Sequence, residues 1–258
     1  MDFRKVFDGI PEEFDKWRTR YCDELFLDLI YYSKLDSSKT SLEIGPGTGQ
    51  ATEPILKTGC SYLAIELGEN LAKYTQNKFS SYDNFQIVNA DFENYDFGNH
   101  QFDLVYSAAT IQWIPEEIGF SKVYDILKSK GTFAMMLTRT DEKSYNELLY
   151  SRIQKVYSEY FRPEKEYTCN LNYNNTKKYG FTDIKCFTYH KIRELNADEY
   201  ISWISTHASH LTLNEPYKSK FYTGIKEAIL SFGNNIKLYD TIVLYLQKSL
   251  NSIKANTI

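Results

Sequence analysis

The sequence predicts an α/β fold, in which a mostly parallel sheet carries helices on both faces. Short apolar segments alternate with segments of helical periodicity up to about residue 138, and glycines stand where several of these segments end. Apolar strands that alternate with helices are typical of βαβ units, whose parallel strands are buried on both faces. The chain has 258 residues, of which 42% are hydrophobic, which is enough for one large domain with an inserted or appended part.

The individual elements follow from the pattern in chain order. The first segment, 11–35, has apolar residues at helical spacing and predicts a helix. The seven strands are expected at 41–45, 61–67, 85–92, 102–109, 132–138, 181–195 and 236–250. The helices between the first five strands are expected at 50–59, 70–79 and 116–131. Gly59 and Gly131 are expected to end the first and the last of these helices.

The pattern changes after Thr138, where helical segments dominate. Helices are expected at 142–161, 197–211 and 217–232. We interpret 141–175 as a helical insertion, and 1–140 together with 176–258 as the core domain. Ligands of such sheets bind beyond the carboxyl ends of the strands, so the helices within about 196–233 are expected to form a lid.

Composition and charge narrow the classes of function. The formal net charge of -4 argues against nucleic acid as the main ligand, because phosphate backbones are bound by surplus lysine and arginine. The four cysteines form no CxxC pair, so no metal site is expected. The N-terminus lacks the apolar region of a signal peptide, and no apolar window is long enough for a transmembrane helix. We therefore expect a cytoplasmic monomer or homodimer that binds neither nucleic acid nor membrane.

The stretch "TSLEIGPGTGQATEPIL", residues 40–56, places a glycine-rich turn between a predicted strand and a predicted helix. Such turns hold nucleotides or nucleosides, because glycine lets the backbone approach a ligand closely. The glycines here are Gly45, Gly47 and Gly49, and Gln50 stands where the dinucleotide fingerprint GxGxxG requires its third glycine. No Gly-Lys-Ser/Thr follows, which excludes a P-loop.

Acidic residues stand at the carboxyl ends of the first three predicted strands. Glu43 precedes the glycine turn, Glu66 ends the second strand, and Asp91, followed by Phe92, ends the third. The place of Glu66 suits a carboxylate that holds two ribose hydroxyls. Asp91 could accept from an exocyclic amine while Phe92 covers a purine face. These acids imply a ligand with a ribose, a purine, no phosphate and positive charge, which describes S-adenosylmethionine.

The segments "LEIGPGTGQAT", "AIEL", "NADF" and "FDLVYSAATIQWI" resemble those of class I S-adenosylmethionine-dependent methyltransferases. More narrowly, they are similar to the trans-aconitate methyltransferase-like, methyltransferase type 11 branch. The resemblance is strong from about residue 12 to 138 and weaker beyond. It implies a Rossmann-like seven-stranded sheet with an antiparallel last strand, methyltransferase activity, S-adenosylmethionine as the cofactor and S-adenosylhomocysteine as the product.

The resemblance also implies which residues hold the methionyl part of the cofactor. Gly45, Gly47 and Gly49 would wrap around it. Glu43 would hold its ammonium, often through water. Ser107, at the end of the fourth strand, would offer backbone contacts near the sulfonium.

The adenosine part is assigned in the same way. Glu66 would bind the ribose hydroxyls, with Leu67 beside the adenine. Asp91 would accept from the adenine amine, with Phe92 against the ring.

The N-terminal segment "FDKWRTRY" resembles a Tyr-Asp-x-x-Arg-Pro-x-Tyr element of the family, whose helix, here 10–33, closes over the cofactor. The resemblance assigns Arg18 to the cofactor and Tyr21 to the acceptor side. The sequence departs from the element, because Phe14 replaces its tyrosine and Thr19 its proline. The alternative for Arg18 is a surface position paired with a neighbouring aspartate.

The acceptor is expected to be a small molecule with a carboxylate, hydroxyl or amine. Methyl transfer from a sulfonium is an in-line displacement, and a general base is needed only where the acceptor atom carries a proton. Gln112 and Trp113 correspond to a Gln-Trp or His-Trp pair of the branch and are the expected acceptor-site residues, with a core position as the alternative for Trp113. His210, three residues after His207 on a predicted helix, is the candidate catalytic base. The alternatives are two surface histidines or a metal pair without further ligands.

Three other functions stay open. An NAD-dependent oxidoreductase conflicts with the missing third glycine and with Glu43. Nucleic-acid methyltransferases that methylate an amine carry Asp/Asn-Pro-Pro-aromatic after the fourth strand, where this chain reads Ser107-Ala108-Ala109-Thr110. A non-catalytic S-adenosylmethionine-binding regulator or scaffold protein would keep the same cofactor residues.

Overall fold

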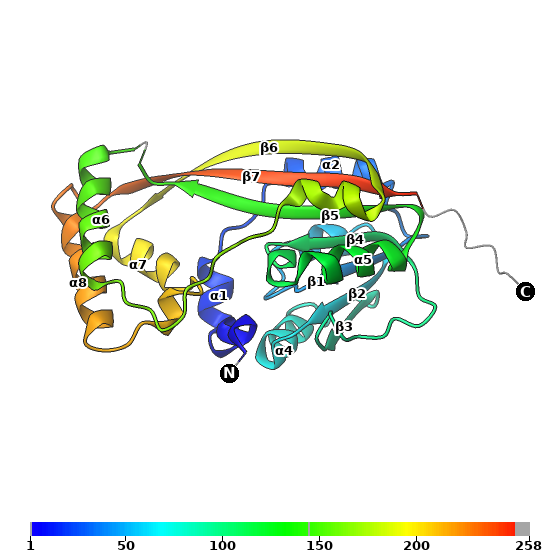
Figure 1. Cartoon of the computed structure of the whole chain (residues 1–258), viewed down its shortest axis with the longest axis horizontal. Helices are drawn as coiled ribbons and strands as arrows, with labels where there is room; N and C mark the ends of the chain where they lie inside the picture. Colours follow the sequence, from blue (N-terminus) through cyan, green and yellow to red (C-terminus); the bar gives the residue numbers. More distant parts are fainter. Residues whose placement is uncertain (1, 144, 251–258) are drawn as a thin grey trace, which may run out of the picture. The chain divides into compact units, whose positions relative to one another are not determined.

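The computed structural model describes residues 2–143 and 145–250 and has the predicted α/β architecture (Figure 1). The chain divides into two compact units. The helical unit comprises the chain up to Arg18, Thr138–Thr168 and His190–Ile242. The sheet unit comprises Thr19–Leu137, Cys169–Tyr189 and the described residues from Val243 onward. Three long strands contribute residues to both units.

The seven strands form one sheet in the order β3-β2-β1-β4-β5-β7-β6. Their bounds are β1 Thr40–Ile44, β2 Ser61–Glu66, β3 Phe85–Asn89, β4 Phe102–Ala108, β5 Leu127–Asp141, β6 Phe181–Leu195 and β7 Ile236–Ser249. The first five strands pair in parallel. The last strand, β7, runs antiparallel to β5 and β6, as the resemblance implied (Figure 1). Ile44 pairs with Ile65, and Glu66 with Asn89, so the carboxyl ends of β1, β2 and β3 are adjacent.

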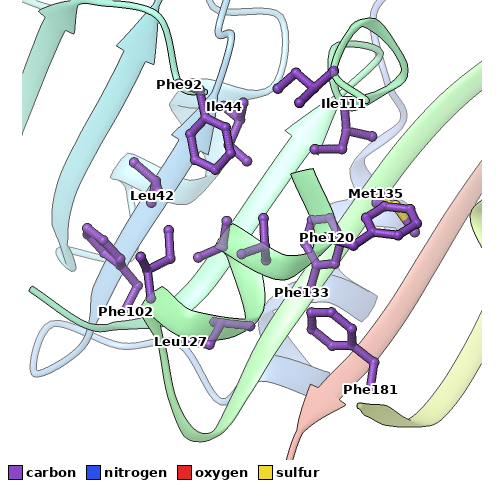
Figure 2. Close-up of a cluster of buried hydrophobic side chains, with 14 of the residues drawn as sticks. Leu42, Ile44, Phe92, Phe102, Ile111, Phe120, Leu127, Phe133, Met135 and Phe181 are labelled. Atoms are coloured by element: carbon purple, nitrogen blue, oxygen red, sulfur yellow. The ribbon is translucent and has the colours of Figure 1, made fainter. Parts of the chain in front are cut away.

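Helices flank the sheet within the sheet unit. They are α2 Asp23–Ser33, α3 Thr52–Leu56, α4 Glu69–Lys78, α5 Glu116–Ile126 and the 3₁₀ helices η2 Ile111–Trp113 and η3 Tyr173–Tyr179. Figure 2 shows the core between α5 and the strands, where the ring centroids of Phe120 and Phe133 lie 6.0 Å apart. Phe133 also packs against Phe181 at 5.4 Å, and all three side chains are buried. Each such buried side chain contributes about 1.5–3 kcal/mol to the free energy of unfolding.

The helical unit has its own apolar core. Its helices are η1 Phe3–Gly9, α1 Pro11–Trp17, α6 Glu147–Tyr160, α7 Ala197–Ser205, η4 His210–Thr212 and α8 Tyr217–Leu230. Both α6 and α7 pack against α8, and Phe221 of α8 lies 4.8 Å from Tyr157 of α6 between ring centroids. Asn196 begins α7 with a capping box, in which its side chain and that of Glu199 each bond the other's backbone N–H.

The predicted N-terminal helix over 10–33 is wrong, because the structure forms α1 and α2 in its place. Arg18 (ψ 141°) and Cys22 (ψ 157°) have extended backbones that separate the two helices. Thr19 is β-branched and favours the helix weakly. Asp23 then begins α2, where a negative charge interacts favourably with the helix dipole.

The predicted helix 116–131 is also too long. The structure ends α5 at Ile126 and starts β5 at Leu127, which pairs with Phe102 of β4. Gly131 therefore lies within a strand rather than at a helix end, and the left-handed residue there is Lys130, with a φ of 61°. Pairing with β4 outweighs the local helical periodicity. No described helix is long and apolar enough to cross a membrane.

Candidate cofactor site

The glycine turn after β1 adopts backbone angles that favour glycine. Gly45, Gly47 and Gly49 have φ values of 65°, 59° and 84°, all in the left-handed region. The amide of Gly45 donates to the carbonyl of Ile65 at 2.8 Å, which fixes the start of the turn to β2. The hydroxyl of Thr75, on α4, donates to the carbonyl of Gly47 at 2.6 Å. The turn is thus held from two neighbouring elements.

Protein side chains, not only a ligand, require two of these glycines. A Cβ at Gly45 would lie 2.3 Å from the Thr110 methyl carbon, and one at Gly49 would lie 2.3 Å from the Phe79 ring. Contacts this short force a neighbouring group to move. The sequence argument explained the glycines by close approach of a ligand. The structure adds that Thr110 and Phe79 occupy the space beside the turn.

Glu66 connects the glycine turn to the start of α4. Its Oε2 accepts from the Gly47 amide and its Oε1 from the Gly68 amide, both at 2.9 Å. The side chain is 6% exposed. Two backbone N–H groups therefore hold the carboxylate at the adjoining ends of β1 and β2. Its predicted grip on ribose hydroxyls stays a prediction.

Glu43 is fully buried within a network of hydroxyl groups. Its Oε2 accepts from Thr52 at 2.6 Å and from the Tyr62 phenol, which also bonds the Tyr106 phenol. Burial raises the pKa of Glu43, and the hydrogen bonds from Thr52 and the tyrosines act in the opposite sense. Oε1 has no hydrogen-bond partner among the described residues. The prediction that Glu43 holds an ammonium remains a prediction.

The side chains at these strand ends suit a ligand rich in hydrogen-bond donors. Carboxylates predominate there, and the unpartnered buried Oε1 of Glu43 can accept one more hydrogen bond. The cation near the turn, Lys78 from α4, donates to the carbonyl of Thr48 at 2.9 Å. The ribose hydroxyls, adenine amine and ammonium of an S-adenosyl ligand are all donors. The residues present therefore fit that cofactor.

The adenine side of the predicted site lies after β3. Asn89, the last residue of β3, donates to the carbonyls of Glu66 and Leu67 at 2.9 and 3.2 Å. Asp91 accepts from the amide of Glu93 at 3.0 Å. Phe92 is 4% exposed and belongs to the core. Asp91 and Leu67 are partly exposed, whereas the ring of Phe92 is packed inside the protein.

The segment after β4 turns back toward the glycine turn. Ala109 has a left-handed φ of 56°, which is uncommon for a residue with a Cβ. The next residue, Thr110, donates to the carbonyl of Gly45 at 2.9 Å. Ser107 is fully buried, and its hydroxyl accepts from the amide of Ile111 at 2.8 Å. The strained turn therefore brings the start of the predicted acceptor segment beside the cofactor turn.

The predicted acceptor residues of the sheet unit are partly buried. Gln112 donates to the carbonyl of Ala109 at 2.9 Å and accepts from the Tyr173 phenol at 3.4 Å. Trp113 is of intermediate exposure in the same 3₁₀ turn. Tyr21 packs edge-on against Phe26, with ring centroids 6.3 Å apart. The structure places Gln112 and Trp113 next to the strained turn. Their contact with an acceptor stays a prediction.

Two predicted site residues belong to the helical unit. The guanidinium of Arg18 lies 5.2 Å from the centroid of the Phe14 ring and 6.0 Å from that of Phe7. His210 is 7% exposed, and its Nε2 lies 2.9 Å from the Tyr157 hydroxyl. Burial lowers the pKa of His210 to about 4, so the imidazole is neutral at pH 7. The alternative of a surface position for His210 does not hold, and its role as a base stays a prediction.

Sequence reasoning missed the phenols beneath the turn. Glu43 pairs with Tyr106 across β1 and β4, and Tyr62 lies on the same side of β2 as Ala64, the partner of Glu43. An acid within a buried strand needs hydrogen-bond donors, and tyrosines at same-face positions of neighbouring strands were the available signal. No comparable signal in the sequence indicated that Thr75 and Thr110 would donate hydrogen bonds to the glycine turn. Among the described residues, no group of three or more histidine, cysteine or acidic side chains could hold a metal ion.

Comparison with known proteins agrees with this geometry. Residues 42–135 match the methyltransferase domain family model. An rRNA adenine N-6-methyltransferase of Limosilactobacillus reuteri is 26% identical over 232 residues, which cover 82% of this chain and 86% of that protein.

Solved structures share the fold at low sequence identity. A putative type II methyltransferase of Anaeromyxobacter dehalogenans aligns with a TM-score of 0.61 and 14% identity over 91% of this chain and 99% of its own. A phosphoethanolamine N-methyltransferase 2 of Haemonchus contortus, in complex with phosphomonomethylethanolamine and S-adenosylhomocysteine, aligns with a TM-score of 0.57 and 16% identity. The alignment covers 97% of this chain and 61% of that enzyme.

Residues 42–135 therefore resemble a methyltransferase domain, and the chain shares the fold of solved methyltransferase structures. The trans-aconitate-like branch is not distinguished by these similarities and stays a prediction. The similarity to an rRNA methyltransferase leaves the expected exclusion of nucleic acid unsupported.

Proposed function

We propose that this protein transfers a methyl group from S-adenosylmethionine to a small-molecule acceptor. The observation that carries the proposal is the Glu66 carboxylate, which the amides of Gly47 and Gly68 hold at the adjoining ends of two strands of the methyltransferase domain. When bound, the cofactor supplies an electrophilic methyl group on a sulfonium. The protein contributes binding, alignment and exclusion of water.

The cofactor would be held from three strand ends. In the proposal, Glu66 accepts from the ribose hydroxyls, and Asp91 accepts from the adenine amine beside Leu67. Glu43 supplies its unpartnered Oε1 toward the ammonium. The other residues proposed to hold the cofactor are Gly45, Gly47, Gly49, Phe92, Ser107 and Arg18.

A carboxylate acceptor agrees best with the low pKa of the candidate base, His210. His210 has a pKa near 4 and a buried ring, so it accepts a proton weakly at neutral pH. A hydroxyl or ammonium acceptor needs a stronger base, whereas a carboxylate needs none. In the proposal, Gln112, Trp113 and Tyr21 position the acceptor.

An adenine in RNA is the second candidate acceptor. The rRNA adenine methyltransferase of Limosilactobacillus reuteri is similar to 82% of this chain. Against it stand the net charge of -4 and the sequence Ser107-Ala108-Ala109-Thr110 after β4, which lacks the proline-aromatic motif expected for methylation of a base amine.

The first test is isothermal titration of the whole chain with S-adenosylmethionine and S-adenosylhomocysteine, with NAD as a control ligand. We expect micromolar binding of the first two ligands and none of NAD. Glu66→Ala should weaken binding by at least about 100-fold, because the hydrogen bonds of a carboxylate to two hydroxyls contribute about 1.5–3 kcal/mol each. Glu69→Ala, the same change on the exposed first turn of α4, should bind normally.

The two candidate acceptors are then distinguished by offering a labelled methyl group to small carboxylic acids and, in parallel, to ribosomal RNA. Label in the acids supports the proposal, and label in the RNA alone replaces it with the second candidate. Absence of cofactor binding by the unmodified chain would refute both.

A further inference from the structure

A basic depression lies in the sheet unit, away from the glycine turn. It has a volume of about 790 Å³. Its lining comes from the end of α2, the segment between α2 and β1, the beginnings of β4, β5 and β6, and the end of the antiparallel β7. The glycine turn follows the carboxyl end of β1, so the two sites occupy opposite ends of the parallel strands.

Positive charge predominates in the lining of the depression. Its five lysines are Lys34, Lys39, Lys130, Lys185 and Lys248. Two carboxylates, Asp103 and Asp183, are present in the lining. Asp103 pairs with Lys128 at 2.7 Å and with Lys39 at 3.5 Å, and Asp183 accepts from the Tyr32 phenol at 3.1 Å.

Four of these lysines have no carboxylate within 4 Å in the described part of the chain; they are Lys34, Lys130, Lys185 and Lys248. Lys248 is partly buried, and its ammonium donates to the Thr132 hydroxyl at 2.7 Å and to the carbonyl of Tyr32 at 3.3 Å. Burial lowers the pKa of Lys248, and the nearby charges of Lys34 and Lys185 lower it further, against the opposing charge of Asp183. A bound anion would compensate this unpaired charge.

An aromatic ring lies among the ammonium groups. The ammonium nitrogens of Lys248 and Lys185 lie 4.7 and 5.0 Å from the centroid of the Tyr32 ring. The neighbouring Tyr31 also lines the depression and is 86% exposed. An exposed tyrosine beside lysines offers a surface on which a nucleotide base can stack.

The backbone of the depression is unusual as well. Five residues other than glycine have a left-handed φ in the described chain, and three of them line this site. They are Lys34 (φ 53°), Lys130 (φ 61°) and Asp183 (φ 45°). Each such residue carries strain on the order of 1–3 kcal/mol, and strain of this kind concentrates at functional sites.

We propose that this depression binds a phosphate group. A phosphate monoester dianion would neutralise two of the unpaired lysines and a backbone phosphodiester one, and either would accept hydrogen bonds from several of them. The phosphate could belong to a free nucleotide or to the backbone of an RNA, which share this chemistry. The site is separate from methyl transfer and does not depend on the proposed acceptor.

The test compares binding of AMP, inorganic phosphate and a single-stranded eight-nucleotide RNA to the full chain. The variant Lys34→Ala/Lys185→Ala removes two exposed lysines of the depression. The control Lys57→Ala/Lys73→Ala removes two exposed lysines outside its lining and changes the net charge equally. We expect at least about tenfold weaker binding, or 1.4 kcal/mol, in the first variant. The control should retain the affinity of the unmodified chain.

The salt dependence identifies the source of the phosphate. If RNA is the ligand, the slope of log affinity against log salt is negative and should become less negative by about 1.4 in the lysine variant, because each neutralised phosphate of a single strand contributes about −0.7. If AMP and phosphate bind as tightly as RNA, the site takes one phosphate. Equal weakening in both variants, or no binding of any probe by the unmodified chain, would overturn the proposal. S-adenosylmethionine binding should be the same in all these proteins, which separates this result from the proposed activity.

Discussion

A single methyl group added at Gly49 tests how tightly the cofactor turn is packed. In Gly49→Ala the new Cβ would lie 2.3 Å from the Phe79 ring, in a backbone with a φ of 84°. The left-handed conformation costs an alanine about 1–2 kcal/mol, and forcing a group into a packed site costs about 1–3 kcal/mol more. We expect the free energy of unfolding to fall by the sum, measured by urea denaturation, and S-adenosylmethionine to bind more weakly.

Gly98 supplies the matched control. It also has a left-handed φ, of 56°, but a Cβ there meets no atom within 4 Å. Gly98→Ala should therefore lose only about 1–2 kcal/mol, from the backbone conformation alone. Equal destabilisation of the two variants would show that Phe79 does not confine the turn.

At this scale the sequence predicted the acids better than their surroundings. The position of Glu66 at the end of β2 was predicted correctly, because an apolar strand ends there, whereas its role at the cofactor stays a prediction. The donors to Glu43 could not, because Tyr62 and Tyr106 are distant in sequence and meet it only through strand register. The same holds for Phe92, which periodicity alone does not distinguish from a pocket residue and which the structure buries.

The elements show where local patterns fail. The strands β6 and β7 were predicted almost to the residue, because long apolar alternation has few competing interpretations. The helix predicted at 116–131 fails at Leu127, where pairing with Phe102 of a neighbouring strand overrides the local helical periodicity. The prediction of one continuous helix over 10–33 fails for a related reason, because the apolar spacing continues across the break at 18–22.

The packing of η4 between α6 and α8 makes a prediction about pH. His210 lies 4.6 Å from Phe161 and 5.6 Å from Phe221 between ring centroids, and its pKa falls from 6.5 to about 4. Below pH 6.5 the unfolded chain takes up a proton that the folded imidazole does not bind until about pH 4. Stability should therefore fall as the pH falls through this window, by up to about 3 kcal/mol from this group.

His210→Phe should remove that part of the pH dependence, as measured by urea denaturation at several pH values between 4 and 7. The same substitution at the exposed His100 should leave the dependence as it is. A His210→Phe protein with the unmodified slope would mean that another group, such as the buried His207, accounts for the dependence.

The division of the whole molecule into two units was not predictable from periodicity. Three of the five boundaries fall inside β5, β6 and β7, between Leu137 and Thr138, Tyr189 and His190, and Ile242 and Val243. No loop or glycine marks these three boundaries, and only the one after Leu137 lies near a predicted change of pattern, which follows Thr138. The predicted boundaries at 140 and 176 followed changes of pattern instead and stay predictions.

The three shared strands predict that the units unfold together. S-adenosylhomocysteine at about 100 times its dissociation constant should stabilise the protein by about 2.7 kcal/mol, because it binds only the folded state. Hydrogen exchange of the backbone amides measures this stabilisation at Leu42 in the sheet unit and at Phe221 in the helical unit. Both residues are fully buried. Because β5, β6 and β7 supply residues to both units, exchange by global unfolding should slow at both positions by the same factor, about 100. Slowing at Leu42 without slowing at Phe221 would show that the helical unit opens independently, and that the shared strands do not transmit the stabilisation.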